Sequence, residues 1–141
     1  MPGIKITPAD KWFGYCVKER VNWTCERCGT QHERGSRGLH CSHFFGRGNH
    51  AIRYSPINAF AHCFGCHRRL GSNPHEFTDW VKNKLGLQTY ETLVELSNDL
   101  MLGKQNRREK KEIAAHYKAE YERIMKLRSE GETGRIEVVG Y

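Results

Sequence analysis

The 141-residue chain has no apolar run that approaches the length of a membrane-spanning helix, and its N-terminus lacks a signal-peptide pattern. These absences argue against a membrane protein and a secreted one, so we expect a cytoplasmic protein with reduced thiols and no membrane contact. Internal repeats are absent as well. Hydrophobic residues make up only 38% of the chain, which is low for a large core. We therefore expect one compact domain with an extension, stabilised in part by bound metal.

Acidic residues are scarce relative to basic ones. The chain has 23 Lys and Arg residues against 16 Asp and Glu residues, which gives a formal net charge of +7. Such a balance favours a polyanionic partner, most often nucleic acid. Because many basic proteins bind no specific polyanion, the charge supports this interpretation only together with the motifs.

Four of the six cysteines form two pairs with the spacing of metal ligands. Two residues separate Cys25 from Cys28, and two separate Cys63 from Cys66. This spacing allows both thiolates of a pair to bind one ion, and two such pairs complete the tetrahedral site of a structural zinc. A disulfide-bonded secreted protein is the alternative interpretation of the same residues.

Local patterns predict an α+β fold. Thr7 and Pro8 are typical of a helix start, and apolar residues then follow helical spacing to Arg20. A strand over residues 39–45 and a return strand over 52–54 would form a small hairpin. Further helices are expected over residues 67–70, 74–85, 89–102 and 105–128.

The helix expected over residues 105–128 is long and highly charged. Its narrow apolar stripe suits docking on the core, but a role in DNA binding or dimerisation fits equally well. The stripe consists of Ile113, Tyr117, Tyr121, Ile124 and Met125. We predict a first unit over residues 1–103 and a charged helical extension with a tail over residues 104–141.

Residues suited to phosphodiester hydrolysis lie between and beside the cysteine pairs. His43 lies near the end of the expected strand and is the candidate general base, because imidazole titrates near neutral pH. His67 directly follows the second pair, where it can ligate a catalytic metal or replace a cysteine on zinc. Asn58 can orient the imidazole or hold its loop, or it is simply a turn residue. Arg47 and Arg53 are placed to bind DNA phosphates.

The order of these residues resembles that of a known nuclease superfamily. The pattern Cys25-x-x-Cys28, Ser42-His43, Asn58, Cys63-x-x-Cys66-His67 is similar to that of the HNH, or His-Me finger, nucleases with a zinc-bound ββα core. Within that superfamily the chain is most similar to the phage recombination endonucleases of the NinG/Rap family. The resemblance runs from about Cys25 to Gly71.

The resemblance implies a metal-dependent DNA endonuclease in the cytoplasm of a phage host or bacterium. Its substrates would include branched recombination intermediates such as Holliday junctions. The fold would be a small zinc-bound ββα core with flanking helices. His43 would be the general base, Asn58 the orienting residue and His67 the ligand of a catalytic Mg²⁺ or Mn²⁺, while the four cysteines would hold a structural Zn²⁺. Symmetric cutting of two strands would favour a homodimer.

One position departs from the superfamily pattern. Many HNH enzymes have Asp directly before the catalytic histidine, where it helps to bind the metal, and this chain has Ser42. Three explanations are open: His67 holds the metal with water and phosphate, His40 contributes, or catalysis has been lost. Strand alternation would place His40 on the opposite face from His43. We favour the first explanation, because the NinG-like pattern tolerates a small residue there. The rival function is a non-catalytic zinc-ribbon module that binds DNA or a protein.

Overall fold

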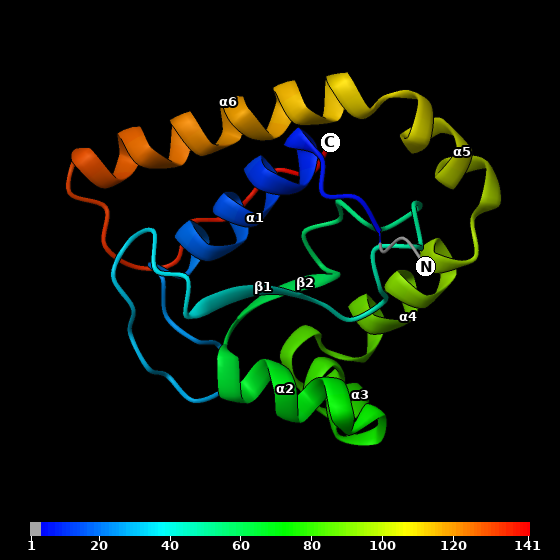
Figure 1. The fold of residues 1–141 in the computed structure, drawn as a ribbon, viewed down its shortest axis with the longest axis horizontal. Coiled ribbons are helices and arrows are strands. Elements are labelled where there is room, and N and C mark those ends of the chain that lie inside the picture. Colours follow the sequence, from blue (N-terminus) through cyan, green and yellow to red (C-terminus); the bar gives the residue numbers. More distant parts are fainter. Residues whose placement is uncertain (1–3) are drawn as a thin grey trace.

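The computed structural model describes residues 4–141 as a mostly helical α+β fold with one two-stranded antiparallel sheet (Figure 1), which agrees with the predicted fold class. The elements are α1 (Pro8–Arg20), β1 (Leu39–His43), β2 (Ala59–Cys63), α2 (Phe64–Ser72), α3 (Pro74–Leu85), α4 (Leu87–Ser97), α5 (Leu100–Arg108) and α6 (Lys110–Ser129). None of the helices over these residues has the length and apolar character needed to cross a membrane.

The sheet lies between helices on its two faces. Helix α1 packs on one face, and α6 runs along the outer side of α1 (Figure 1). On the other face, α2 follows β2 directly and packs against the sheet and α3. Three apolar clusters therefore hold the hairpin: one is shared with α1 and α6, a second with α2, α3 and α4, and a third with the residues around the first cysteine pair.

Helix α1 begins as the sequence predicts. The Thr7 hydroxyl accepts a hydrogen bond from the Asp10 backbone N–H, and the Asp10 carboxylate accepts one from the Thr7 backbone N–H at 2.8 Å. This capping box pairs two backbone donors that the helix itself leaves free, and Pro8 at the first position lacks such a donor. Farther along the helix, Cys16 is fully buried, as expected of a cysteine that packs as a small apolar group.

The hairpin differs from the prediction in its second strand. Residues 52–54 are not a strand; β1 pairs instead with Ala59–Cys63, in a register that places His43 opposite Ala59. Residues 44–58 form a loop of turns whose ends meet, because the Phe44 N–H donates to the Asn58 carbonyl at 2.9 Å. Ile52 is buried, but it packs from this loop into the cluster beneath α3.

The helices after residue 86 also differ from the prediction. The helix predicted over residues 89–102 ends at Ser97, and a separate helix, α5, then runs from Leu100 through Gly103 to Arg108. The boundary predicted after residue 103 therefore falls inside α5. Helix α6 starts at Lys110 rather than at residue 105, and its apolar stripe docks on α1 within one core. Ile113, Tyr117 and Ile124 are buried there.

Candidate metal centre and histidine site

The two cysteine pairs come together, as predicted from their spacing. The sulfur atoms of Cys25, Cys28, Cys63 and Cys66 all lie within 4.8 Å of one another. The Cys28 and Cys63 sulfurs are 3.8 Å apart. Zinc–sulfur bonds of about 2.3 Å in a tetrahedron place neighbouring sulfurs about 3.8 Å apart. The four thiols therefore fit a zinc ion, and such an ion would have no position left for water.

Both pairs have the same local geometry. The Cys28 N–H points at the Cys25 sulfur at 3.5 Å, and the Cys66 N–H points at the Cys63 sulfur at 3.4 Å. These turns hold both thiols of a pair on one side of the backbone. The second turn is also the first turn of α2, where the Cys63 side chain is the helix cap. A zinc ion here would join the loop after α1 to the β2–α2 junction.

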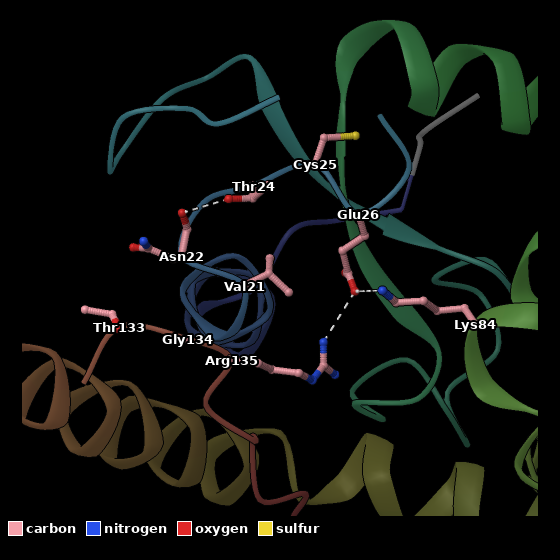
Figure 2. Close-up of a pocket in the computed structure, with 9 residues that line it drawn as sticks. All are labelled: Val21, Asn22, Thr24, Cys25, Glu26, Lys84, Thr133, Gly134 and Arg135. Carbon is pink, nitrogen blue, oxygen red and sulfur yellow. Dashed lines mark hydrogen bonds and ion pairs between the residues drawn. The ribbon is translucent and has the colours of Figure 1, made fainter. Parts of the chain in front are cut away.

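The residue after Cys25 has a buried carboxylate that ties the first cysteine pair to β2. Glu26 accepts a hydrogen bond from the Ala61 N–H of β2 at 2.8 Å. In Figure 2, Lys84 and Arg135 reach the Glu26 carboxylate at 3.4 and 3.5 Å, while the sulfur of Cys25 points away from it. The hollow drawn there measures about 590 Å³, and none of the predicted catalytic residues lines it.

His43 is the last residue of β1, and only one of its two ring nitrogens makes a hydrogen bond. Its Nε2 lies 2.9 Å from the carbonyl oxygen of Arg53 in the loop, so Nε2 carries the proton and donates it. The Nδ1 atom is buried and has no hydrogen-bond partner among the described residues. Burial of the ring and the positive charge of Arg47 lower the pKa of His43 to about 4.

Asn58 closes the loop that supplies this carbonyl. Its Oδ1 accepts from the Phe45 N–H at 2.9 Å, and its Nδ2 donates to the carbonyls of Phe45 and Ile52 at 2.9 and 3.1 Å. All polar atoms of the buried amide are thereby paired within the loop. Of the two roles considered for Asn58, the geometry favours holding the loop; any orienting effect on His43 would act through that loop.

The expectation that Arg53 binds DNA phosphates is corrected by the structure. The Arg53 side chain is 2% exposed, and its guanidinium makes two bonds, 3.0 and 2.7 Å long, to the Asp10 carboxylate. It also donates to the Lys5 carbonyl at 2.8 Å. Burial would raise the pKa of Asp10, but the hydrogen bonds and charge of Arg53 and the Thr7 N–H hold it below its usual value. Arg53 thus ties the loop to the start of α1.

Replacing Arg53 by methionine is expected to lower the free energy of unfolding by about 3–5 kcal/mol, because the Asp10 carboxylate would remain buried without its partner. Urea denaturation followed by circular dichroism measures this change. Arg68→Met is the matched control, since Arg68 is exposed on α2. A loss of less than about 1 kcal/mol at Arg53 would show that the pair is not the anchor of this loop.

His67 has an imidazole partner that the sequence left open. Its Nδ1 lies 2.9 Å from Nδ1 of His40, a distance that suits either a hydrogen bond or two adjacent ligands of one ion with bonds of about 2.1 Å. His40 projects toward α2, whereas the His43 ring lies 5.9 Å from that of Phe13 on α1, as strand alternation predicts. Ser42 is fully buried and its hydroxyl has no hydrogen-bond partner within residues 4–141, so it offers no ligand at the surface.

One hollow joins the histidines of the two elements. His43, Arg47 and His67 line it, so the end of β1 and the start of α2 meet here. We call it the histidine hollow; it measures about 400 Å³, and its other lining residues are Ile4, Cys41 and Gly46. The Arg47 side chain is 33% exposed and its Nε lies 3.7 Å from Asp10, too far for a strong pair. Arg47 therefore presents a largely uncompensated cation beside His43.

Two supporting residues were not identified from the sequence. Asp10 reads as an acidic residue in the first turn of a helix, and nothing in its local pattern indicates a partner 43 positions away. Glu26 is one of the two residues between the paired cysteines, and the motif assigns it no role. Its side chain is nevertheless buried and faces three cations, Arg20, Lys84 and Arg135. Only the packing of distant segments places these charges together.

Three comparisons, with protein-family models, with curated proteins and with solved structures, found no match to this chain.

Proposed function

We propose that this chain is a metal-dependent DNA endonuclease that hydrolyses phosphodiester bonds, with a structural zinc at its cysteines. The observation that carries the proposal is the state of His43. One ring nitrogen is fixed by a backbone carbonyl, the other is buried without a partner, and the ring lines a hollow shared with Arg47 and His67. A fixed neutral imidazole beside a cation and a second imidazole suits proton abstraction next to a bound phosphate.

The protonation state of His43 supports this role. With a pKa of about 4, the ring is neutral at pH 7, and Nδ1 is the unprotonated nitrogen that remains to accept a proton. A base with so low a pKa abstracts protons weakly, since efficiency is best when the pKa lies near the working pH. Binding of a phosphodiester would offset the charge of Arg47 and raise the pKa of His43. Substrate binding would thereby make His43 a stronger base.

His40 and His67 are the residues that would hold a catalytic divalent ion. Two imidazole nitrogens 2.9 Å apart fit adjacent positions around one ion. Nitrogen ligands suit transition metals better than Mg²⁺, which prefers oxygen. When bound, such an ion would supply positive charge to the phosphate and to the departing 3′ oxygen. This donor set favours the explanation in which His40 takes the place of the missing Asp.

Wild-type protein is expected to cut DNA with Mn²⁺, Co²⁺ or Ni²⁺ at lower metal concentrations than with Mg²⁺, and not at all with a chelator. The assay uses linear, nicked and four-way-junction DNA, with circular dichroism to verify that the chelator leaves the fold intact. His40→Ala should raise the metal concentration needed for half-maximal cleavage, whereas His75→Ala, on the exposed start of α3, should not. Binding of all three DNAs without any cleavage would refute the endonuclease proposal.

Arg47→Gln is expected to raise the pKa of His43 above about 4, because the substitution removes the cation that disfavours the imidazolium. NMR titration of the His43 ring measures the change directly, and the acid limb of the cleavage profile should move to higher pH in parallel. Lys126→Gln, on the far end of α6, is the control of equal charge. An unchanged His43 titration in the Arg47 variant would contradict the electrostatic account.

A non-catalytic zinc module that binds DNA or a protein is the second candidate. Within residues 4–141 the four cysteines are the one group of three or more metal-ligating residues, so His40 and His67 lack a third protein ligand. The buried Ser42, in place of a metal-binding Asp, also favours the non-catalytic module. The cleavage assay separates the two candidates.

A further inference from the structure

Helix α5 has features that its neighbours lack. It contains no buried residue, although it connects α4 to α6 at the edge of the molecule (Figure 1). Leu100 and Met101, at its start, are 79% and 70% exposed. They are the two most exposed large apolar side chains of the described residues, and they are adjacent on an otherwise basic segment.

Cations follow these apolar residues along the same helix. Lys104 and Arg107 lie four and seven positions after Leu100, so all three share one face. Arg108 at the end of α5 and Lys110 and Lys111 at the start of α6 extend the charge, and none of these five cations has an ion-pair partner among the described residues. By contrast, Arg53, Arg123 and Arg128 are engaged with carboxylates within the fold.

The shared face of α5 forms one wall of a second hollow. Residues 48–51 of the loop line it together with Ser97, Asp99, Leu100, Gly103, Lys104 and Arg107, so two cations and one carboxylate face it. We call it the α5 hollow; it measures about 470 Å³. Burial lowers the pKa of His50, which lines the same hollow, and the charges of Arg53, Arg107 and Lys110 lower it further, against a smaller opposite effect of Asp10.

Consecutive residues of the loop line the two hollows. Arg47 lines the histidine hollow and the next residue, Gly48, lines the α5 hollow. Hydrogen bonds fix the loop to this side of the molecule: Asn49 donates to the Ser97 carbonyl at 2.9 Å, and Asn106 donates to the His50 carbonyl at 3.0 Å. Cations on α5 are therefore held in a set position relative to His43.

We propose that the α5 hollow binds one arm of a branched DNA next to the cleavage position, with Lys104 and Arg107 on backbone phosphates and Leu100 and Met101 against the exposed base pair at the branch. This inference rests on the proposed function for the identity of the nucleic acid. Unpaired cations favour phosphates. Leucine and methionine pack against unstacked base pairs in other DNA complexes, and a branch point presents such a surface without the cost of unstacking a duplex.

Binding assays on the His43→Ala protein test the inference without cleavage, using a four-way junction and a linear duplex of equal length. Lys104→Gln with Arg107→Gln should weaken junction binding and reduce the slope of log affinity against log salt by about 2, since each lost phosphate contact removes about 0.9. Leu100→Ser with Met101→Ser should weaken junction binding several-fold while duplex binding changes little. Lys118→Gln with Lys126→Gln on α6 is the control of equal charge.

The outcomes separate this inference from the proposed function. Unchanged junction affinity and salt slope in the Lys104 and Arg107 variant would overturn the α5 surface, even if wild-type protein cuts DNA. Equal losses on junction and duplex in the Leu100 and Met101 variant would overturn the contact with the branch. If the wild-type protein never cuts DNA but the α5 variants lose junction binding, the α5 binding surface is supported and the endonuclease proposal is rejected.

Discussion

Cys63→Ala protein is expected to lose both its zinc and its cooperative fold. The segment that holds the first cysteine pair contributes only Trp23 and Cys25 to the buried apolar cluster around it. The other members, Leu39, Ala61 and Cys66, belong to the hairpin and to α2. Structural zinc sites contribute about 10–16 kcal/mol of apparent binding free energy. Because domains are stable by only about 5–15 kcal/mol in total, loss of the ion should exceed the margin.

Mass spectrometry under native conditions measures the bound zinc, and a thermal melt followed by circular dichroism measures the fold. Cys41→Ala is the matched control, because Cys41 lies outside the four-sulfur cluster. It should keep one zinc per chain and melt cooperatively. A Cys63→Ala protein that melts like the wild type would refute the structural role of the metal. Wild-type protein that folds without zinc would do the same.

His43→Gln protein is expected to cut DNA about 10²–10⁴ times more slowly than wild type, which is the usual contribution of a general base. Glutamine fills part of the volume of the ring, so the variant should retain the contact with Phe13 and the fold around β1. Single-turnover cleavage of the best substrate measures the rate. DNA affinity, measured in parallel, should change by much less than the rate, because the cations that bind phosphates remain.

His75→Gln is the control for this prediction, since His75 is exposed on α3 and lies outside the histidine hollow. It should cut at the wild-type rate. Equal cleavage by the His43 variant would mean that another group takes the proton, and the assignment of the base would be wrong. Near-equal losses in rate and affinity would instead assign His43 to substrate binding.

The features that the sequence determined by itself are local ones. Two residues between cysteines suffice to form a turn that presents both sulfurs to one ion, whatever the rest of the chain does. Thr7 and Pro8 likewise specify the start of α1 through bonds within four residues. The first strand belongs to this class too, because the local pattern predicts its start at Leu39, although the strand ends at His43 and not at residue 45.

Tertiary structure alone decided the features that depend on distant partners. The return strand was misplaced because Ile52 is buried by packing under α3, while residues 59–63 have the register that pairs with β1. From the sequence, Arg53 is a plausible phosphate ligand. In the structure it is buried and paired with Asp10, 43 residues away in the chain. The contact between His40 and His67 likewise depends on how α2 seats against the sheet. A charged or apolar side chain has the same sequence signature whether it meets solvent, DNA or another segment, so only the packed chain distinguishes these cases.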